Sequence, residues 1–324
     1  MEFDRLDRLR PFLTGSSAAV PVGVGDDAAV VLIGGAQVVV CTDTVVEGVH
    51  FRRDLSLPGD VGWKSLAVNV SDIAAMGAKP TAAVIGLNRT ASLTEADIDA
   101  FYAGLAQAAS AYDVAIVGGD TVTAGQWSVT VTVLGDLQGR PAVLRQGARP
   151  GDAVVLAGPL GAATAALWAQ ARGSTALPEH LGAHRRPDAL PATGQALAAV
   201  GVTSMIDLSD GLGADAAHVC RASQVSMHLQ SQLLQQRLAP GVHTALGGDW
   251  LHTTIGGGED FALLSTIPTD LVEGALAAVA AAGETTAAVI GSVGEVEPGG
   301  LPTVWLSTPG GAPQRIDELG YDHG

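Results

Sequence analysis

Charged side chains are scarce in this chain, and positive ones are the scarcer kind. Only 15% of the 324 residues are charged, with 17 Lys or Arg against 33 Asp or Glu, which gives a formal net charge of −16. Surfaces that bind nucleic acids concentrate Lys and Arg against the phosphates, so this balance excludes a nucleic-acid partner. An acidic protein also repels phosphate compounds, unless bound metal ions reverse the local field.

Cysteine and uninterrupted apolar runs are scarce as well. Cys41 and Cys220 are far apart and lack metal-ligand spacing, which indicates buried thiols in a reducing compartment. Apolar stretches such as 264–282 are interrupted by Asp, Glu and Pro, which excludes a membrane span. The first residues lack the apolar core of a secretory signal. We therefore expect a cytoplasmic protein that has no membrane partner.

The common nucleotide-binding signatures are missing too. Lys64 and Lys79 are the only lysines and neither follows a glycine loop, which excludes a P-loop. The V-A-I-K and H-R-D motifs of eukaryotic-type kinases are absent. The glycines near Gly23 are followed by acidic residues where a dinucleotide pyrophosphate would approach. Any ATP would therefore be bound mainly through metal ions, the backbone amides at Gly118 and Gly119, and an arginine, for which Arg145 is the natural candidate.

What the chain does contain is typical of an α/β protein with two domains. It is 47% hydrophobic with 42 glycines, and its length suffices for two cores. Gly, Pro and Arg accumulate in the segment 139–152, which predicts a boundary inside or just before it. We place the domains at 1–137 and 138–324.

Hydrophobic periodicity predicts the main elements. A helical stripe of Phe3, Leu6, Leu9 and Leu13 opens the chain. Further helices are expected over 62–76, 94–111 and 161–171, and strands over 37–42, 81–87, 113–117, 127–134, 153–157 and 204–208. The strand over 113–117 is expected to be buried and to end at Gly118, and the strand over 37–42 is expected to end at Asp43.

Six short motifs combine a carboxylate with Gly, Ser or Thr. They are GDDAAV (25–30), CTDTVVEGVHF (41–51), NVSDIAAMGA (69–78), GGDT (118–121), DLSDGL (207–212) and GGGEDF (256–261). Any one of them alone is typical of a turn or a helix N-cap. Five of the six follow apolar runs that would bury their carboxylates, and unpaired buried charges are costly. Carboxylate and hydroxyl oxygens are the ligands that Mg²⁺ prefers, so the set predicts one site for several divalent cations.

Together with the segment 63–80 and the terminal GYDH, these motifs resemble the thiamine-monophosphate kinase family. The resemblance runs from Gly25 to the C-terminus, and T-D-T-x-x-E-G-V-H-F and G-Y-D-H are its most specific parts. The superfamily also contains aminoimidazole ribonucleotide synthetase, selenophosphate synthetase and a carbamoyl-dehydrating hydrogenase maturation factor. The selenophosphate enzymes carry a reactive Cys or selenocysteine in a glycine-rich N-terminal loop, and this chain has no such Cys. It also lacks the C-terminal Cys of the dehydratases.

The resemblance implies an enzyme that transfers the γ-phosphoryl group of ATP to thiamine monophosphate, the last step of thiamine diphosphate biosynthesis. A phosphate acceptor has its second pKa at about 6, so it is mostly ionised and needs no strong general base. The difficulty is that two anionic phosphates must meet in line, which clustered Mg²⁺ ions would relieve. The implied fold is a two-domain α/β arrangement in which the N-terminal sheet pairs across a homodimer and an α+β domain completes the cleft.

The resemblance also implies a role for particular residues. The metal positions are Asp27, Thr42, Asp43, Asp72, Asp120, Asp207 and Asp210. The ATP contacts are Gly119, Asp120, Arg145 and Ser209, with Tyr102 beside the nucleotide. The substrate contacts are His50, Glu259 and Tyr321. Cys41 stands where relatives can carry Ser, so we expect no metal ligation through its side chain.

Two alternatives remain open from the sequence. One is another superfamily enzyme that uses ATP to activate an amide or carbonyl oxygen. The other is a non-catalytic nucleotide-binding relative, which the intact set of carboxylates disfavours because an inactive protein has no reason to bury so much charge.

Overall fold

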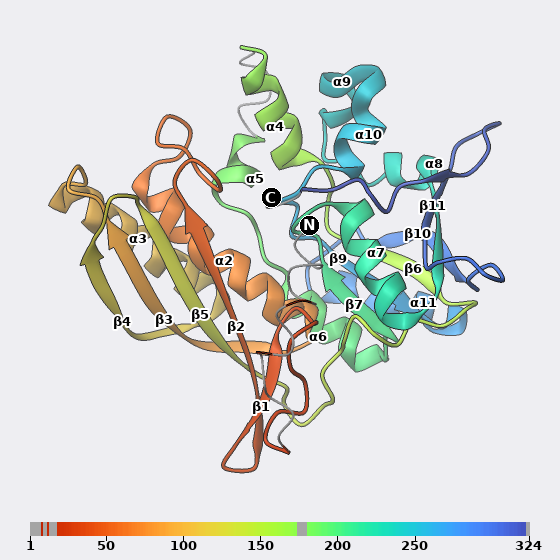
Figure 1. The fold of residues 1–324 in the computed structure, drawn as a ribbon, viewed down its shortest axis with the longest axis horizontal. Helices are drawn as coiled ribbons and strands as arrows, with labels where there is room; N and C mark the ends of the chain where they lie inside the picture. Colours follow the sequence, from red (N-terminus) through yellow and green to blue (C-terminus); the bar gives the residue numbers. More distant parts are fainter. Residues whose placement is uncertain (1–7, 9–11, 13–17, 174–179, 322–324) are drawn as a thin grey trace.

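The computed structural model of the chain describes residues 18–173 and 180–321, together with Arg8 and Phe12. The helical stripe predicted at Phe3, Leu6, Leu9 and Leu13 lies outside the described residues, as do Asp322 and His323 of the terminal GYDH. The mixed α/β class expected from the sequence is confirmed, and Figure 1 shows a sheet in each half of the molecule.

The first half is a five-stranded sheet covered on one face by two helices. The strand order is β1-β2-β5-β3-β4, and only β3 and β4 run parallel. The strands are β1 (Ala29–Ile33), β2 (Ala36–Val46), β3 (Lys79–Arg89), β4 (Ala115–Thr123) and β5 (Ser128–Asp136). The helices are α2 (Pro58–Ala75) and α3 (Glu95–Tyr112). The start predicted for α3 is confirmed, because Thr94 and Asp97 cap each other's backbone N–H groups.

Glycines let α2 and α3 approach each other more closely than side chains would allow. A Cβ atom on Gly104 would lie 1.8 Å from the carbonyl oxygen of Gly59. One on Gly62 would lie 2.1 Å from that of Phe101. The close crossing fixes α2 over the sheet, and α2 carries several residues of the site described below.

Two strand predictions need correction. β2 does not end at Asp43 but continues to Val46, because this part of the strand pairs with β5 over its whole length. β4 is neither buried nor finished at Gly118. Every residue of it is exposed, it continues to Thr123, and it pairs with β3 alone, so its apolar residues have no second layer over them within the described chain.

The second half is a seven-stranded sheet of order β12-β11-β8-β10-β6-β9-β7. Its strands are β6 (Ala153–Ala157), β7 (Ser204–Asp207), β8 (Ser226–Gln230), β9 (Leu263–Ile267), β10 (Ala288–Gly294), β11 (Val304–Ser307) and β12 (Gln314–Arg315). The helices are α4 (Ala162–Ala171), α5 (Leu181–Arg185), α6 (Pro191–Val200), α7 (Leu212–Ser223), α8 (Ser231–Gln235), α9 (Val242–Leu246), α10 (Trp250–Ile255) and α11 (Val272–Ala281). Short 3₁₀ turns cover Gly247–Asp249 and Thr269–Leu271.

Strand β6 shows why the second half needs helices on both faces of its sheet. All five of its residues are buried. Val154 and Leu156 belong to the core that contains α7, whereas Val155 and Ala157 belong to the core that contains α6 and α11. The continuous apolar run therefore marks a strand in the middle of three layers.

Helix α2 lies between the two halves (Figure 1). Its last turn, with Ala74 and Ala75, is part of the core formed by α6, α11 and the second sheet. Segment 137–152, which contains the predicted domain boundary, carries no helix or strand. The division at residue 137 stays a prediction.

Candidate active site

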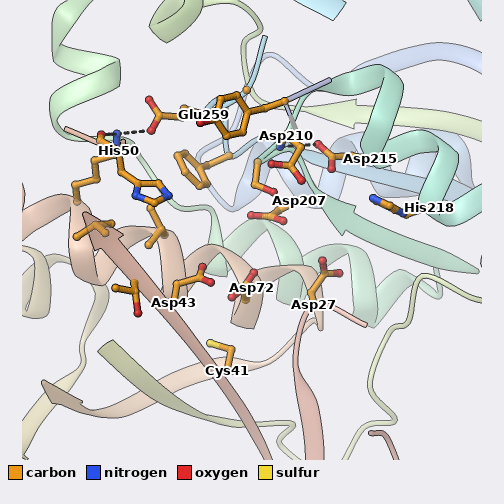
Figure 2. Close-up of a pocket in the computed structure, with 18 of the residues that line it drawn as sticks. Asp27, Cys41, Asp43, His50, Asp72, Asp207, Asp210, Asp215, His218 and Glu259 are labelled. Atoms are coloured by element: carbon orange, nitrogen blue, oxygen red, sulfur yellow. Dashed lines mark hydrogen bonds and ion pairs between the residues drawn. The ribbon is translucent and has the colours of Figure 1, made fainter. Parts of the chain in front are cut away.

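A cavity of about 950 Å³ lies between the two halves of the molecule. Its wall comes from the loop before β1, from β2, α2, α4 and α5, from the turn between β7 and α7, and from the loop before β9. Most residues predicted for the site line it: Asp27, Thr42, Asp43, His50, Asp72, Arg145, Asp207, Ser209, Asp210, Glu259 and Tyr321. Figure 2 shows His50 and Glu259 at one side of this space and Asp27, Asp72 and Asp207 further along it.

Three carboxylates from distant segments meet in the wall. Asp27 precedes β1, Asp72 lies on α2 and Asp207 ends β7, and an oxygen of each lies within 4.8 Å of the others. Burial raises the pKa of all three. The charges of neighbouring aspartates raise the pKa of Asp72 and Asp207 further, the latter to about 7, whereas the charge of Arg145 lowers that of Asp27 in part. Ser71 donates a hydrogen bond of 2.5 Å to Asp207, which fixes one carboxylate of the group.

This cluster has the chemistry of a divalent cation site. Oδ2 of Asp27 is buried and has no hydrogen-bond donor among the described residues. Like charges at this spacing repel each other in a buried wall unless a cation or protons lie between them. Hard carboxylate oxygens are what Mg²⁺ binds. The residues present therefore fit the cation that the sequence predicted.

Arg145 contacts the carboxylates of the loop before β1. Its side chain donates to Oδ1 of Asp27 and its backbone N–H donates to Asp26. Burial and the neighbouring charge of Asp27 raise the pKa of Asp26 to about 7. Arg145 lines the cavity, and its predicted contact with ATP stays a prediction.

Asn69 orients the residues of β2, although the sequence reasoning missed it. Its side-chain oxygen accepts the backbone N–H of Asp43 at 2.8 Å, and its side-chain nitrogen donates to Ser65 on the same helix. The thiol of Cys41 donates to the backbone carbonyl of Asn69 at 3.3 Å, and burial raises the pKa of that thiol well above its usual value. Cys41 is therefore a buried thiol, as the sequence predicted. The sequence offered one indication of a role for Asn69, because this residue opens the motif that contains Asp72.

Asp215 shapes the turn between β7 and α7. Its carboxylate accepts the backbone N–H groups of Asp210 and Gly211, at 3.2 and 3.0 Å. Gly211 has φ of 118°, which side-chain-bearing residues rarely adopt, so the turn needs a glycine there. The sequence reasoning missed Asp215, which is fully inside the protein and points back at the turn from the first turn of α7.

A second group of polar side chains lies at the other side of the cavity. Lys64 on α2 and His184 on α5 both contact the carboxylate of Glu259. His50 accepts the backbone N–H of Val46 on its Nδ1 at 3.0 Å. Lys64 and His184 were not predicted, because each stands alone in the sequence within an apolar or basic stretch. Tyr321, the third predicted substrate contact, is attached instead to the turn after β7, where its backbone N–H donates to the carbonyl of Asp210 at 2.9 Å.

Gly119, Asp120 and Tyr102 do not line this cavity. Asp120 lies in β4 in register with Gly86, then Thr130, then Thr44 of β2. Strands are spaced by about 4.8 Å, so Asp120 lies about 14 Å from Thr44 in the same chain. One chain therefore does not bring Asp120 to the site that Thr42 and Asp43 help to form, and Gly119 and Tyr102 lie outside the cavity lining. Their roles stay predictions.

None of the described helices combines the length and the apolar character that crossing a membrane requires.

Family models and curated relatives that match this chain all point to one family, and together they cover most of its length. The family model described as AIR synthase related protein, N-terminal domain, matches residues 25–137, and the corresponding C-terminal domain matches residues 149–301. Thiamine-monophosphate kinase of Mycobacterium tuberculosis (strain H37Rv) is 42% identical over 270 residues, which cover 82% of this chain and 80% of that protein. The same enzyme of Bacillus subtilis (strain 168) is 36% identical over 278 residues, covering 83% of this chain and 84% of the relative.

Solved structures share the fold of this chain over most of its length. One described as AaThiL complexed with AMPPCP and TMP is 29% identical, with a TM-score of 0.84, and covers 100% of this chain and 97% of its own. A hydrogenase maturation protein HypE, 23% identical with a TM-score of 0.75 over 90% of this chain and 91% of its own, shares the fold.

Proposed function

The chain belongs to the thiamine-monophosphate kinase family, and we propose that it transfers the γ-phosphoryl group of ATP to thiamine monophosphate in the cytoplasm, giving ADP and thiamine diphosphate. The observation that carries this proposal is the single cavity that joins the carboxylates of Asp27, Asp72 and Asp207 to the polar group around Glu259. A solved relative of the same fold is described as holding AMPPCP and TMP together, so the fold has room for a nucleotide and an acceptor at once.

The polar groups of the cavity suit an acceptor that is already ionised. A phosphate monoester carries most of its second charge at neutral pH, so the enzyme needs no general base. His50 fits this requirement. Because its Nδ1 accepts the N–H of Val46, its hydrogen is on Nε2, and the ring acts as a hydrogen-bond donor toward a substrate.

Asp27, Asp72 and Asp207 would hold Mg²⁺, with Asp43 and Asp210 beside them in the same wall. The bound ions would supply positive charge between two phosphates that must approach in line. The protein's own part is to keep the carboxylates in place. Ser71 fixes Asp207, Asn69 fixes the backbone at Asp43, and Asp215 fixes the turn that carries Asp210.

We also propose a homodimer in which the open face of the first sheet meets the same face of a second copy. Val84, Val122 and Leu134 are 44%, 47% and 36% exposed on the face opposite α2 and α3. Exposed apolar residues in neighbouring strands indicate an interface. Asp120 lies on this face in register with Gly86, so the interface would bring it toward the cavity of the partner.

The test is incubation of the protein with ATP, Mg²⁺ and thiamine monophosphate, with thiamine diphosphate and ADP separated by chromatography. We expect both products in equal amounts. Formation of ADP only with a substrate that carries an amide or formyl group would favour an enzyme that activates carbonyl oxygens. Binding of both ligands without turnover under any divalent metal would contradict the proposal.

A further inference from the structure

Lys64 connects His50 and Glu259, two residues that the family resemblance assigns to the acceptor substrate. Its ammonium group donates to the backbone carbonyl of His50 at 2.8 Å and to Oε1 of Glu259 at 2.5 Å. The side chain is only 2% exposed, although it lines the cavity. We infer that Lys64, together with His184, is a positioning residue that holds Glu259 and His50 in the arrangement that binds thiamine monophosphate. This inference rests on the proposed function.

His184 holds the second oxygen of the same carboxylate. Its Nδ1 lies 2.5 Å from Oε2 of Glu259 and 3.5 Å from the ammonium nitrogen of Lys64. Each oxygen of Glu259 therefore has its own partner, which fixes the rotation of the carboxylate as well as its place. A carboxylate fixed in this way offers its remaining lone pairs in defined directions.

Helix α5 is attached to the first half of the molecule just after His184. Arg185 donates to the carbonyl of Leu55, and Arg186 donates to Asp60 at 2.6 Å. The indole of Trp63 donates to the carbonyl of Pro187 at 2.8 Å. Trp63 precedes Lys64 on α2, so both partners of Glu259 are held against the same helix.

The loop of Glu259 is attached to the metal side of the cavity. The backbone N–H of Glu259 donates to the carbonyl of Ser209 at 2.8 Å. Its φ of 68° is a left-handed conformation that a non-glycine residue adopts at a cost, so the surrounding contacts must impose it. The backbone of Glu259 is thus fixed relative to Asp210, and its side chain relative to His50. Lys64 completes the connection between the two sides.

The charge of Lys64 also determines the state of Glu259. Burial alone raises the pKa of Glu259, but the charge of Lys64 and the hydrogen bond from His184 outweigh burial and bring that pKa to about 2. Glu259 is therefore an ionised acceptor whose charge is balanced by its neighbour. Without Lys64, a free negative charge would face an anionic substrate. We therefore expect the affinity for thiamine monophosphate to fall, while nucleotide binding is retained.

The main experiment compares Lys64→Met with Lys79→Met in steady-state kinetics. Lys79 is a matched control, because it pairs with Asp113 at 2.8 Å on the surface, away from the cavity. Loss of a charge-assisted hydrogen bond predicts that Lys64→Met raises KM for thiamine monophosphate at least about tenfold. KM for ATP should stay within about twofold of wild type, given that Lys64 contacts only the acceptor side. Equal increases in both KM values, or no change in either, would overturn the inference.

A rescue experiment separates positioning from general damage. Lys64→Ala leaves a space of the size of propylammonium beside Glu259, so added propylamine should lower the raised KM for thiamine monophosphate, whereas propanol should not. Absence of rescue by the amine contradicts the inference. If the Lys64 variants do not fold, His184→Asn tests the inference instead. It should raise KM for thiamine monophosphate and leave KM for ATP unchanged. If the wild type produces thiamine diphosphate but the variants change both KM values alike, the inference about Lys64 is refuted and the proposed function still stands.

Discussion

Arg145 binds one oxygen of Asp27 twice, through Nε at 3.1 Å and through Nη2 at 2.6 Å, while the other oxygen has no partner among the described residues. The carboxylate is thus stabilised on one side and left open toward Asp72 and Asp207 on the other. One positive charge does not neutralise three carboxylates. Arg145 therefore offsets only part of the negative charge of the cluster, and a bound cation would balance the rest.

Arg145→Met should destabilise the metal-free protein. Removing one partner of a buried ion pair leaves an uncompensated charge, which typically costs about 3–5 kcal/mol. Mg²⁺ should recover part of this loss, since a cation replaces the missing charge. Thermal unfolding with and without Mg²⁺ measures both effects. Arg149→Met is the control, because Arg149 is exposed. An equal melting temperature for Arg145→Met and wild type without metal would contradict this account.

Asp72→Asn should increase stability and abolish activity. The substitution removes a buried carboxylate whose pKa is raised by burial and by neighbouring aspartates, so the melting temperature of the metal-free protein should rise. Phosphoryl transfer should fall about 100-fold or more, because a metal ligand is lost. Calorimetry and product formation are compared with those of Asp99→Asn on the exposed side of α3. A stable variant with normal turnover would show that Asp72 is no ligand.

Asp260→Asn should change how stability depends on pH. Burial raises the pKa of Asp260 to about 8, from an ordinary value of 3.8, so the folded state holds a proton that the unfolded state has released between these pH values. Stability of the wild type therefore falls as pH rises from about 4 to about 8, and this contribution is absent in the variant. The hydrogen bond from Gly161 to Oδ1 is retained by Asn.

The measurement for Asp260→Asn is a series of melting temperatures from pH 4.5 to pH 8.5. The variant should match the wild type at the acidic end and exceed it increasingly toward pH 8. Parallel curves across the range would refute the assignment. Because Asp260 does not line the cavity, the difference is not confused with loss of a ligand.

Val84→Asp should convert the protein to a monomer. The side chain is 44% exposed on the open face of the first sheet, so a charge there is tolerated in a single chain but is costly between two faces. Light scattering after size-exclusion chromatography gives the mass directly. A wild type that is monomeric at every concentration would rule out the proposed dimer.

Mixed dimers test where Asp120 acts. If Asp120 completes the partner's site, Asp120→Asn and Asp43→Asn are each inactive, but a refolded mixture regains about a quarter of wild-type activity. The reason is that half of the dimers are mixed and each mixed dimer has one intact site. If Asp120 acts within its own chain, the mixture stays inactive. Mixing either variant with itself is the control.

Local patterns predicted the elements well. Strand β6 has the bounds expected from its apolar run, and α3 begins after Thr94 because the capping pair is encoded within four residues. The apolar run of β4 predicted a buried strand, and this prediction was wrong. Nothing in that run encodes that β4 is an edge strand whose apolar residues no second layer covers within the described chain.

The site was predictable where a motif carries its own signal. Asp27, Asp72 and Asp207 were expected to be close together, and they are. Lys64, His184 and Asp215 have no such signal. Each acts through a partner that only the folded chain brings near, such as Glu259, which is 195 residues away from Lys64 along the sequence.

Helix α2 contributes to the hydrophobic cores of both halves, and this affects how the protein unfolds. Leu66 and Ile73 belong to the core of the first half, while Ala74 and Ala75 belong to a core of the second. A Cβ atom on Gly194 of α6 would lie 2.1 Å from the carbonyl oxygen of Ala74, so the two halves touch along backbone. Neither half can lose its structure without exposing apolar surface of the other. Heating should therefore give one cooperative transition rather than two, with amides of α2 among the last to exchange.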